Sequence, residues 1–99
     1  MQKTAKKIIL ATDKPYSSEY ESLLQNLYDR QIELFCAWGL HCQQWELAMD
    51  VVITDPIHGE DFHHITTTSH PDEPFEDVID LANSWFLESE DDTVEIIRL

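Results

Sequence analysis

Short apolar runs alternate with longer helical patterns along this chain, and this alternation restricts the fold more than any other feature. The runs occupy residues 6–12, 32–38, 62–69 and 94–99. Apolar and β-branched runs of this length, bounded by charged or turn residues, are typical of strands. Strands that alternate with helices need crossover connections, which produce a parallel sheet. The sequence therefore predicts an α/β fold with the order βαβαβαβ.

Three segments between these runs have the spacing of amphipathic helices. The first begins at Ser18, which forms the S-x-x-E pattern of a capping box with Glu21. The second begins near Leu40, and its end stays open because residues 51–54 also suit a short strand. The third has Pro74 in its first turn, where a missing N–H costs little. Apolar residues at intervals of three and four predict the buried faces: Tyr20, Leu23, Leu24, Leu27 and Tyr28; Cys42, Trp45, Met49 and Val52; Phe75, Val78, Ile79, Ala82 and Phe86.

The expected architecture is a small three-layer domain that spans residues 1–99, a length that suits one domain. Its sheet has four mostly parallel strands in the order 2-1-3-4, with helices on both faces, as in a truncated doubly wound fold. We expect the third strand to be central, because residues 62–69 are rich in β-branched side chains. The fourth strand is expected at an edge, where it could pair with a second copy. A monomer or a weak homodimer follows from this.

The apolar runs are too short for membrane insertion. None approaches the roughly 20 residues of a membrane helix. Residues 8–11 are also shorter than the core of a signal peptide. We therefore expect a cytoplasmic protein whose Cys36 and Cys42 are reduced, although spacing alone also permits a disulfide between them.

Charge is distributed unevenly, with a formal net value of −14. Residues 1–30 carry five lysines or arginines against four acidic residues, whereas residues 31–99 carry one arginine against sixteen. This field repels phosphate backbones, which argues against nucleic-acid binding, and it attracts basic proteins. A role in solubility alone is the simpler interpretation. The functional interpretation is a non-enzymatic protein-binding module, similar to an immunity protein or an inhibitor, with a basic partner. The contact residues would be Glu76, Asp77, Asp80, Glu88, Glu90, Asp91 and Asp92.

A second class of function places a small-ligand or enzymatic site at one edge of the sheet. In open parallel α/β sheets, ligands bind beyond the carboxyl ends of the strands. The first three strands should end in loops that meet at this edge. The candidate residues there are Asp13, Trp38, His41, Cys42, Ser69, His70 and Asp72.

Specific chemistry at that edge is harder to support. Asp13, His41, Cys42 and His70 offer donors that zinc accepts, but their spacing matches no zinc motif, so no metal is predicted. Cys42 lies near a helix N-terminus, which lowers a thiol pKa, and His41 or His70 could act as its base. Its place on the apolar stripe favours the core instead. No catalytic residue and no cofactor are therefore predicted.

The three tryptophans divide into two groups. Trp45 and Trp85 fit helical stripes, which predicts burial in the core. Trp38 ends a strand beside Gly39, where an aromatic side chain can equally line a pocket, form an interface or pack inward. Its role stays open at this point.

Two stretches, CAWGLHCQQW at residues 36–45 and TTTSHPDEPFEDVIDLA at residues 66–82, resemble a family of short bacterial proteins of uncharacterised function. In that family a C-A-W-G-x-x-C segment opens a helix, and a T-T-x-H-x-D-E segment leads into the last helix. The resemblance covers most of the chain. It implies no activity, but it implies that the loops after the second and third strands act together. The matching residues are Cys36, Ala37, Trp38, Gly39 and Cys42, then Thr67, Thr68, His70, Asp72 and Glu73.

Overall fold

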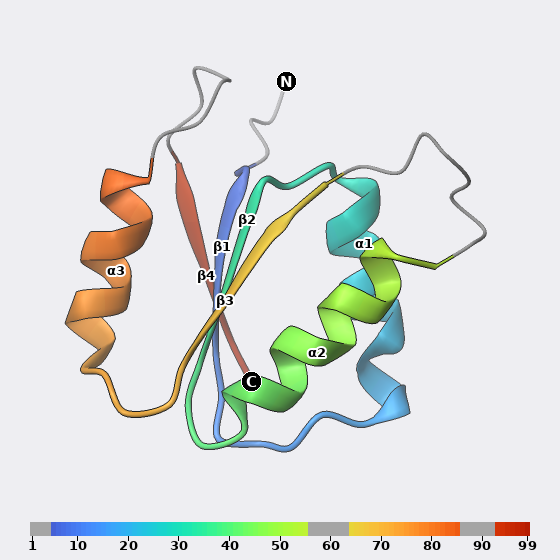
Figure 1. Ribbon diagram of the computed structural model, residues 1–99, viewed down its shortest axis with the longest axis horizontal. Helices are drawn as coiled ribbons and strands as arrows, with labels where there is room; N and C mark the ends of the chain where they lie inside the picture. Colours follow the sequence, from blue (N-terminus) through green and yellow to red (C-terminus); the bar gives the residue numbers. More distant parts are fainter. Residues whose placement is uncertain (1–4, 56–63, 86–92) are drawn as a thin grey trace.

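The computed structural model describes residues 5–55, 64–85 and 93–99. Its sheet lies between α1 and α2 on one face and α3 on the other, so the predicted α/β class with helices on both faces is confirmed (Figure 1). All strand pairs are parallel. In chain order the elements are β1 (Lys7–Ala11), the 3₁₀ helix η1 (Ser18–Tyr20), α1 (Glu21–Asp29), β2 (Leu34–Trp38), α2 (Cys42–Ile53), β3 (Thr66–His70), α3 (Phe75–Ser84) and β4 (Val94–Arg98).

The strand order is β3-β2-β1-β4, so the predicted order 2-1-3-4 is wrong. Burial explains the difference. Every residue of β1 and all but the last of β2 are buried, whereas most of β3 is only partly buried. The two apolar strands therefore occupy the centre, and β3 lies at an edge rather than centrally. The predicted edge position of β4 is confirmed.

The polar side chains of β3 explain why this strand suits an edge. The Thr67 hydroxyl donates to Asp50 Oδ1 at 2.8 Å, and the Ser69 hydroxyl donates to Glu46 Oε1 at 3.1 Å. Two residues along a strand advance about 6.6 Å, and four along a helix about 6 Å, so the two pairs align. Thr67 and Ser69, two residues apart on β3, thus form hydrogen bonds with carboxylates on one face of α2.

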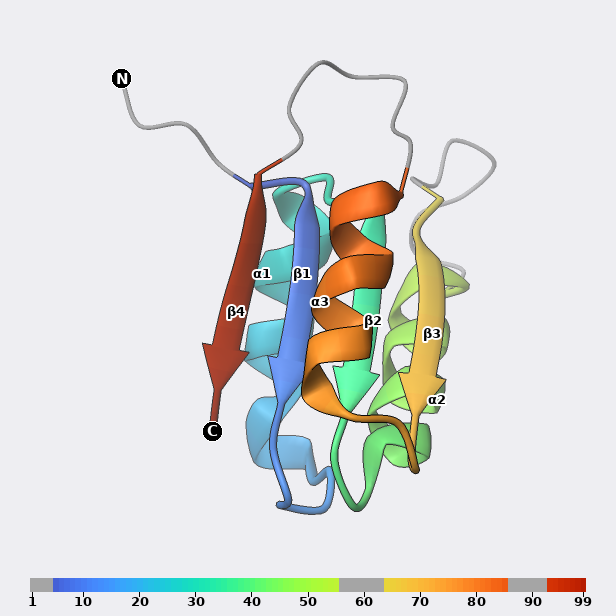
Figure 2. The ribbon, with the colours of Figure 1, turned by 90° about the vertical axis from the view of Figure 1, so that its left-hand side faces the viewer.

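The direction of the chain across the sheet determines which face each helix covers. From β1 to β2 to β3 the chain moves one way, and right-handed crossovers then place α1 and α2 on the same face. From β3 to β4 it returns the other way, which places α3 on the opposite face. Figure 2 shows α3 in front of β1 and β2, with β4 and β3 on either side.

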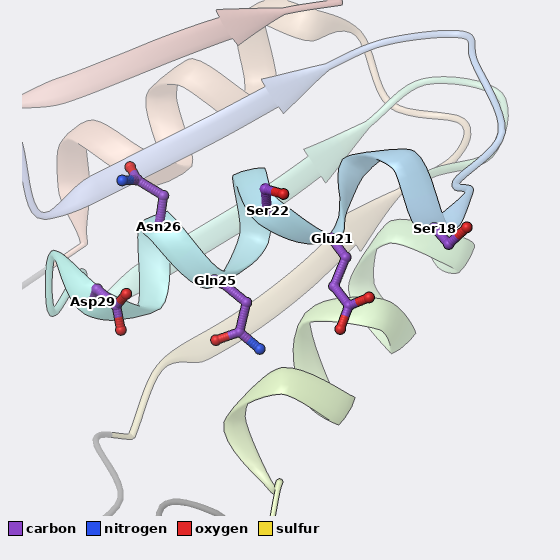
Figure 3. A pocket seen from close by; sticks show the side chains of 6 residues that line it. All are labelled: Ser18, Glu21, Ser22, Gln25, Asn26 and Asp29. Atoms are coloured by element: carbon purple, nitrogen blue, oxygen red, sulfur yellow. The ribbon is translucent and has the colours of Figure 1, made fainter.

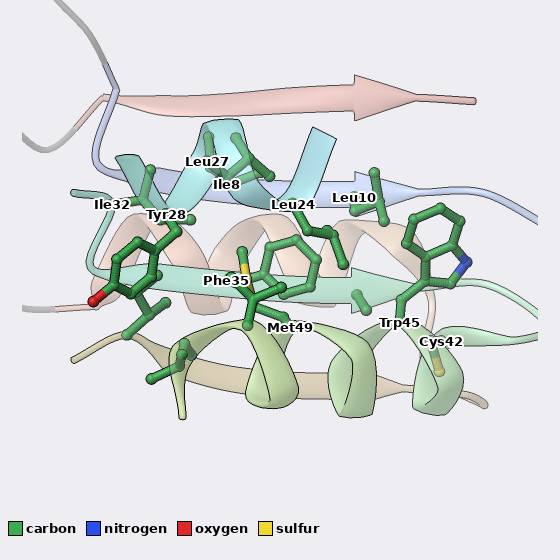
Figure 4. Close-up of a cluster of buried hydrophobic side chains, with 14 residues drawn as sticks. Ile8, Leu10, Leu24, Leu27, Tyr28, Ile32, Phe35, Cys42, Trp45 and Met49 are labelled. Atoms are coloured by element: carbon green, nitrogen blue, oxygen red, sulfur yellow. The ribbon is translucent and has the colours of Figure 1, made fainter. Parts of the chain in front are cut away.

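The larger part of the core fills the space between the sheet and the helices α1 and α2 (Figure 4). The predicted inner faces of both helices are confirmed, and Trp45 is fully buried there. A smaller cluster lies under α3, where Val78 and Ala82 are buried and Phe75, Ile79 and Trp85 are partly buried. Trp85 therefore packs against the core without being enclosed by it. Phe86, predicted in the same stripe, lies outside the described residues.

Three helix starts differ from the prediction. The Ser18 capping box does not form: Ser18 begins the 3₁₀ helix, and α1 starts only at Glu21 without a side-chain cap. The rings of Tyr16 and Tyr20 pack against Trp45, with centroids 5.2 and 5.1 Å away, which fixes this segment by tertiary contact instead.

The remaining helix boundaries shift by smaller amounts. The second helix, α2, begins at Cys42 and continues through Ile53, so residues 51–54 are not a strand. In α3, Pro74 is the N-cap residue rather than a member of the first turn.

Lys7 lies under the other end of α3, where its buried Nζ donates to the carbonyl of Ala82 at 2.8 Å. A cation at a helix C-terminus is stabilised by the helix dipole.

Within the described part of the chain, no helix has the length and apolar character needed to cross a membrane.

Gly39 joins β2 to α2 in a conformation that other residues rarely adopt. Its φ is +127°, and a Cβ built on its backbone would overlap the backbone carbonyl of Thr12. The loops after β1 and β2 can therefore approach each other closely because Gly39 has no side chain.

We predict that Gly39→Ala lowers the free energy of unfolding by at least about 2 kcal/mol, because a strained backbone and a steric overlap act together. Chemical denaturation measures this. Gln31 is the control, because it is a non-glycine residue with a positive φ of 59°. Glycine adopts positive φ without steric cost, so Gln31→Gly should leave the free energy of unfolding unchanged or raise it. A wild-type midpoint for Gly39→Ala would contradict the close approach of the two loops.

Candidate site at the carboxyl edge of the sheet

All four strands end at the same edge, so the three loops expected there do meet. In the sheet register Trp38 pairs with Ala11 on one side and with His70 on the other. Ala11 also pairs with Arg98 at the end of β4. The side chains at this edge nevertheless alternate between the two faces of the sheet.

That alternation separates the seven candidate residues. Trp38 and His70 lie on the face covered by α3, whereas Ser69 points toward α2 and is bound to Glu46. Cys42 is 1% exposed and belongs to the core under α1 and α2 (Figure 4). The set therefore does not converge on one pocket. Of the others, Asp13 and Asp72 are exposed, and His41 is the partly buried N-cap residue of α2.

His70 is a buried titratable side chain at this edge, with a contact at each ring nitrogen. It is 6% exposed, its Nδ1 lies 3.1 Å from Glu73 Oε1, and its Nε2 lies 2.8 Å from the Thr68 hydroxyl. A carboxylate oxygen accepts hydrogen bonds, which gives Nδ1 the donor role in this contact. The Trp38 indole N–H donates to the Glu73 carbonyl at 2.8 Å. These contacts fasten the loop between β3 and α3 to the ends of β2 and β3.

The contacts run from the Glu73 carboxylate through the His70 imidazole to the Thr68 hydroxyl, which is the connectivity of a catalytic triad. Here both ring nitrogens of His70 are occupied by protein side chains, and the Thr68 hydroxyl also bonds the buried Cys36 thiol. Burial raises the pKa of Cys36, an effect that the Thr68 hydrogen bond partly offsets. The arrangement therefore anchors a loop.

A cavity of about 270 Å³ opens between the ends of β1, β2 and β4. Asp13 and Trp38 line it, as does Arg98, which was not among the residues predicted for this edge of the sheet. The Arg98 guanidinium carbon lies 4.9 Å from the centroid of the Phe75 ring, and that ring packs edge-on against Trp38 at 4.9 Å. Arg98 alternates with Ile97 along β4, but only the strand order reveals its place beside β1. The remaining lining residues are Ala11, Thr12 and Leu99.

A larger hollow of about 450 Å³ lies over the outer side of η1 and α1 (Figure 3). Its lining residues recur at intervals of three and four, which makes them the solvent face of an amphipathic helix. Figure 3 shows their side chains spread along the helix rather than aimed at a common centre. We assign no site to this surface. The lining residues are Ser18, Glu21, Ser22, Gln25, Asn26 and Asp29.

His41, Cys42, His70 and Asp13 carry the side-chain types that zinc accepts as ligands. Across residues 5–55, 64–85 and 93–99, no three His, Cys, Asp or Glu side chains are grouped so that they could hold a metal ion. Both cysteines are free and buried.

The fold and this edge define a small parallel α/β protein of the doubly wound class. The chain belongs to a family described as a domain of unknown function, DUF7684, whose model matches residues 1–97. No curated protein and no solved structure matches the chain.

The buried Cys36 thiol generates a pH prediction. Because its pKa is raised in the folded state, the folded protein keeps a proton that the unfolded chain loses near pH 9. This contribution to stability is complete below the unfolded pKa and is lost as pH rises through the folded pKa. The free energy of unfolding should therefore fall more steeply for the wild type than for Cys36→Ala as pH rises above about 8.5. Parallel pH profiles in denaturation experiments would show that Cys36 is not desolvated in the fold.

Proposed function

We propose that this domain is a protein-binding module that engages a basic partner through the carboxylates at the start of α3. Glu76, Asp77 and Asp80 are exposed on this helix, and Asp72 is exposed in the loop before it. We call these four residues the α3 acidic face. The observation that supports the proposal is that, within the described part of the chain, none of the four forms an ion pair.

Lys6, Lys7 and Arg30 have partners away from these four carboxylates, so they do not neutralise this surface. Lys6 donates to the carbonyls of residues 30 and 31, and Lys7 is buried against α3. Arg30 pairs with Glu95 at 3.0 Å. The negative charge of the α3 acidic face is therefore available to a partner.

The packing of α3 determines where this charge points. Val78 and Ala82 are buried against the sheet, which turns Glu76, Asp77 and Asp80 toward solvent. A preformed charged surface speeds the encounter with a partner of opposite sign.

Local helix energetics explain only part of this pattern. Glu76 and Asp77 lie in the first turn, where acidic side chains interact favourably with the helix dipole. Asp80 lies one turn further on, four residues from Glu76, and like charges at that spacing are mildly destabilising. Asp80 thus has a cost to the helix that binding of a cationic partner would offset.

Glu88, Glu90, Asp91 and Asp92 were also predicted to belong to the contact surface. These four residues lie outside the described residues. The proposal therefore depends on the α3 acidic face alone.

The test compares two triple variants that remove the same charge from different surfaces. Variant E76Q/D77N/D80N neutralises the α3 acidic face, and E19Q/E21Q/D29N neutralises η1 and α1. With a fluorescent deca-lysine peptide as the probe at low salt, the first variant should weaken binding about tenfold or more and the second much less. Binding of the wild type should also weaken steeply as salt rises. Equal losses in the two variants would show that only the net charge matters, which would refute a site on α3.

A further inference from the structure

The cavity beside Arg98 opens at the carboxyl edge of the sheet, the edge at which open parallel α/β sheets bind ligands. At this edge the chain leaves β1 toward α1, whereas α3 leads into β4 at the opposite, amino edge. The cavity lies at the carboxyl ends of these two neighbouring strands.

The cavity has one positive and one negative side chain. Arg98 is exposed and, among the described residues, forms no ion pair although the chain is strongly acidic. Asp13 accepts one long hydrogen bond, from the Leu40 N–H at 3.4 Å, which leaves other lone pairs of its carboxylate for a ligand. The two charges therefore face the cavity with unused hydrogen-bonding capacity.

The sheet register separates these charges along the strand direction. Arg98 pairs with Ala11, and Asp13 follows Ala11 by two residues. A molecule between Arg98 and Asp13 would thus meet opposite charges at its two ends, with the Trp38 ring as the apolar wall.

Size narrows the class of ligand. A volume of about 270 Å³ equals that of about nine water molecules, at about 30 Å³ each. This is smaller than the pockets of about 300–1,000 Å³ that hold drug-sized ligands. A purely anionic molecule is also disfavoured. Arg98 would pair with its negative charge, but the carboxylate of Asp13 would then face it without a positive partner.

We propose that the β1–β4 cavity binds a small zwitterion of the α-amino-acid type. Its carboxylate would bind Arg98, its ammonium group would bind Asp13, and its side chain would lie against Trp38. Guanidinium and carboxylate groups form strong charge-assisted hydrogen bonds, and Phe75 beneath Arg98 holds the guanidinium in place. This proposal is independent of the α3 acidic face.

The first experiment uses L-leucine and L-phenylalanine as probes and follows the Trp38 indole N–H and the Thr12 amide by NMR. Saturable shifts are expected with at least one of the two amino acids. The corresponding amide lacks the carboxylate, and the corresponding des-amino acid lacks the ammonium group. Each analogue should bind about tenfold or more weakly.

The second experiment tests the residues. Arg98→Gln and Asp13→Asn should each weaken binding about tenfold or more, because one charged hydrogen-bond partner is lost. Lys14→Gln and Glu19→Gln are matched controls outside the cavity lining, and both should bind as the wild type does. Amide proton spectra show whether each variant keeps the fold.

Three results would overturn the proposal: no saturable shifts at millimolar concentrations of either amino acid, amides that bind as tightly as the amino acids, or unchanged binding in Arg98→Gln. The variant E76Q/D77N/D80N should retain amino-acid binding. Failure of the cavity and failure of the α3 acidic face are therefore distinguishable.

Discussion

The complete burial of β1 is the constraint on which the other features of the structure depend. Every residue of β1 is buried, so the strand needs a neighbour on each side and a helix layer on each face. β2 and β4 supply the neighbours, α1 and α2 cover one face, and α3 covers the other. Even the charged Lys7 is accommodated, because the last turn of α3 offers it a carbonyl acceptor. The positions of the covering helices follow from this arrangement.

The sequence was sufficient for the fold class because periodicity is a local property. The alternation of apolar runs with helical stripes predicted the seven main elements in the right order, and the predicted residues of α1 and α2 do face the core, although buried Ile53 was missed. Strand order is not local, and β-branched content was a misleading guide to it. In β3 the hydroxyls of Thr67 and Ser69 bond carboxylates on α2, a polar pattern that fits an edge strand.

The candidate site was predictable to the level of the sheet edge. Two of the seven residues expected there, Asp13 and Trp38, line one cavity. Neighbours in a strand point to opposite faces, which separates Ser69 from His70, and the apolar stripe of α2 takes Cys42 into the core. Arg98 was missed for a related reason. It reaches the cavity only because β4 pairs with β1, so the error in strand order concealed it.

The pairing of β1 with β4 is therefore the central claim, and nuclear Overhauser effects between backbone protons test it most directly. The account predicts cross-strand effects between the segments around Ile9 and Ile96, which are partners in the sheet register. Effects between β1 and β3 in their place would restore the order 2-1-3-4. That result would move Arg98 away from Ala11 and contradict the account of both the fold and the cavity.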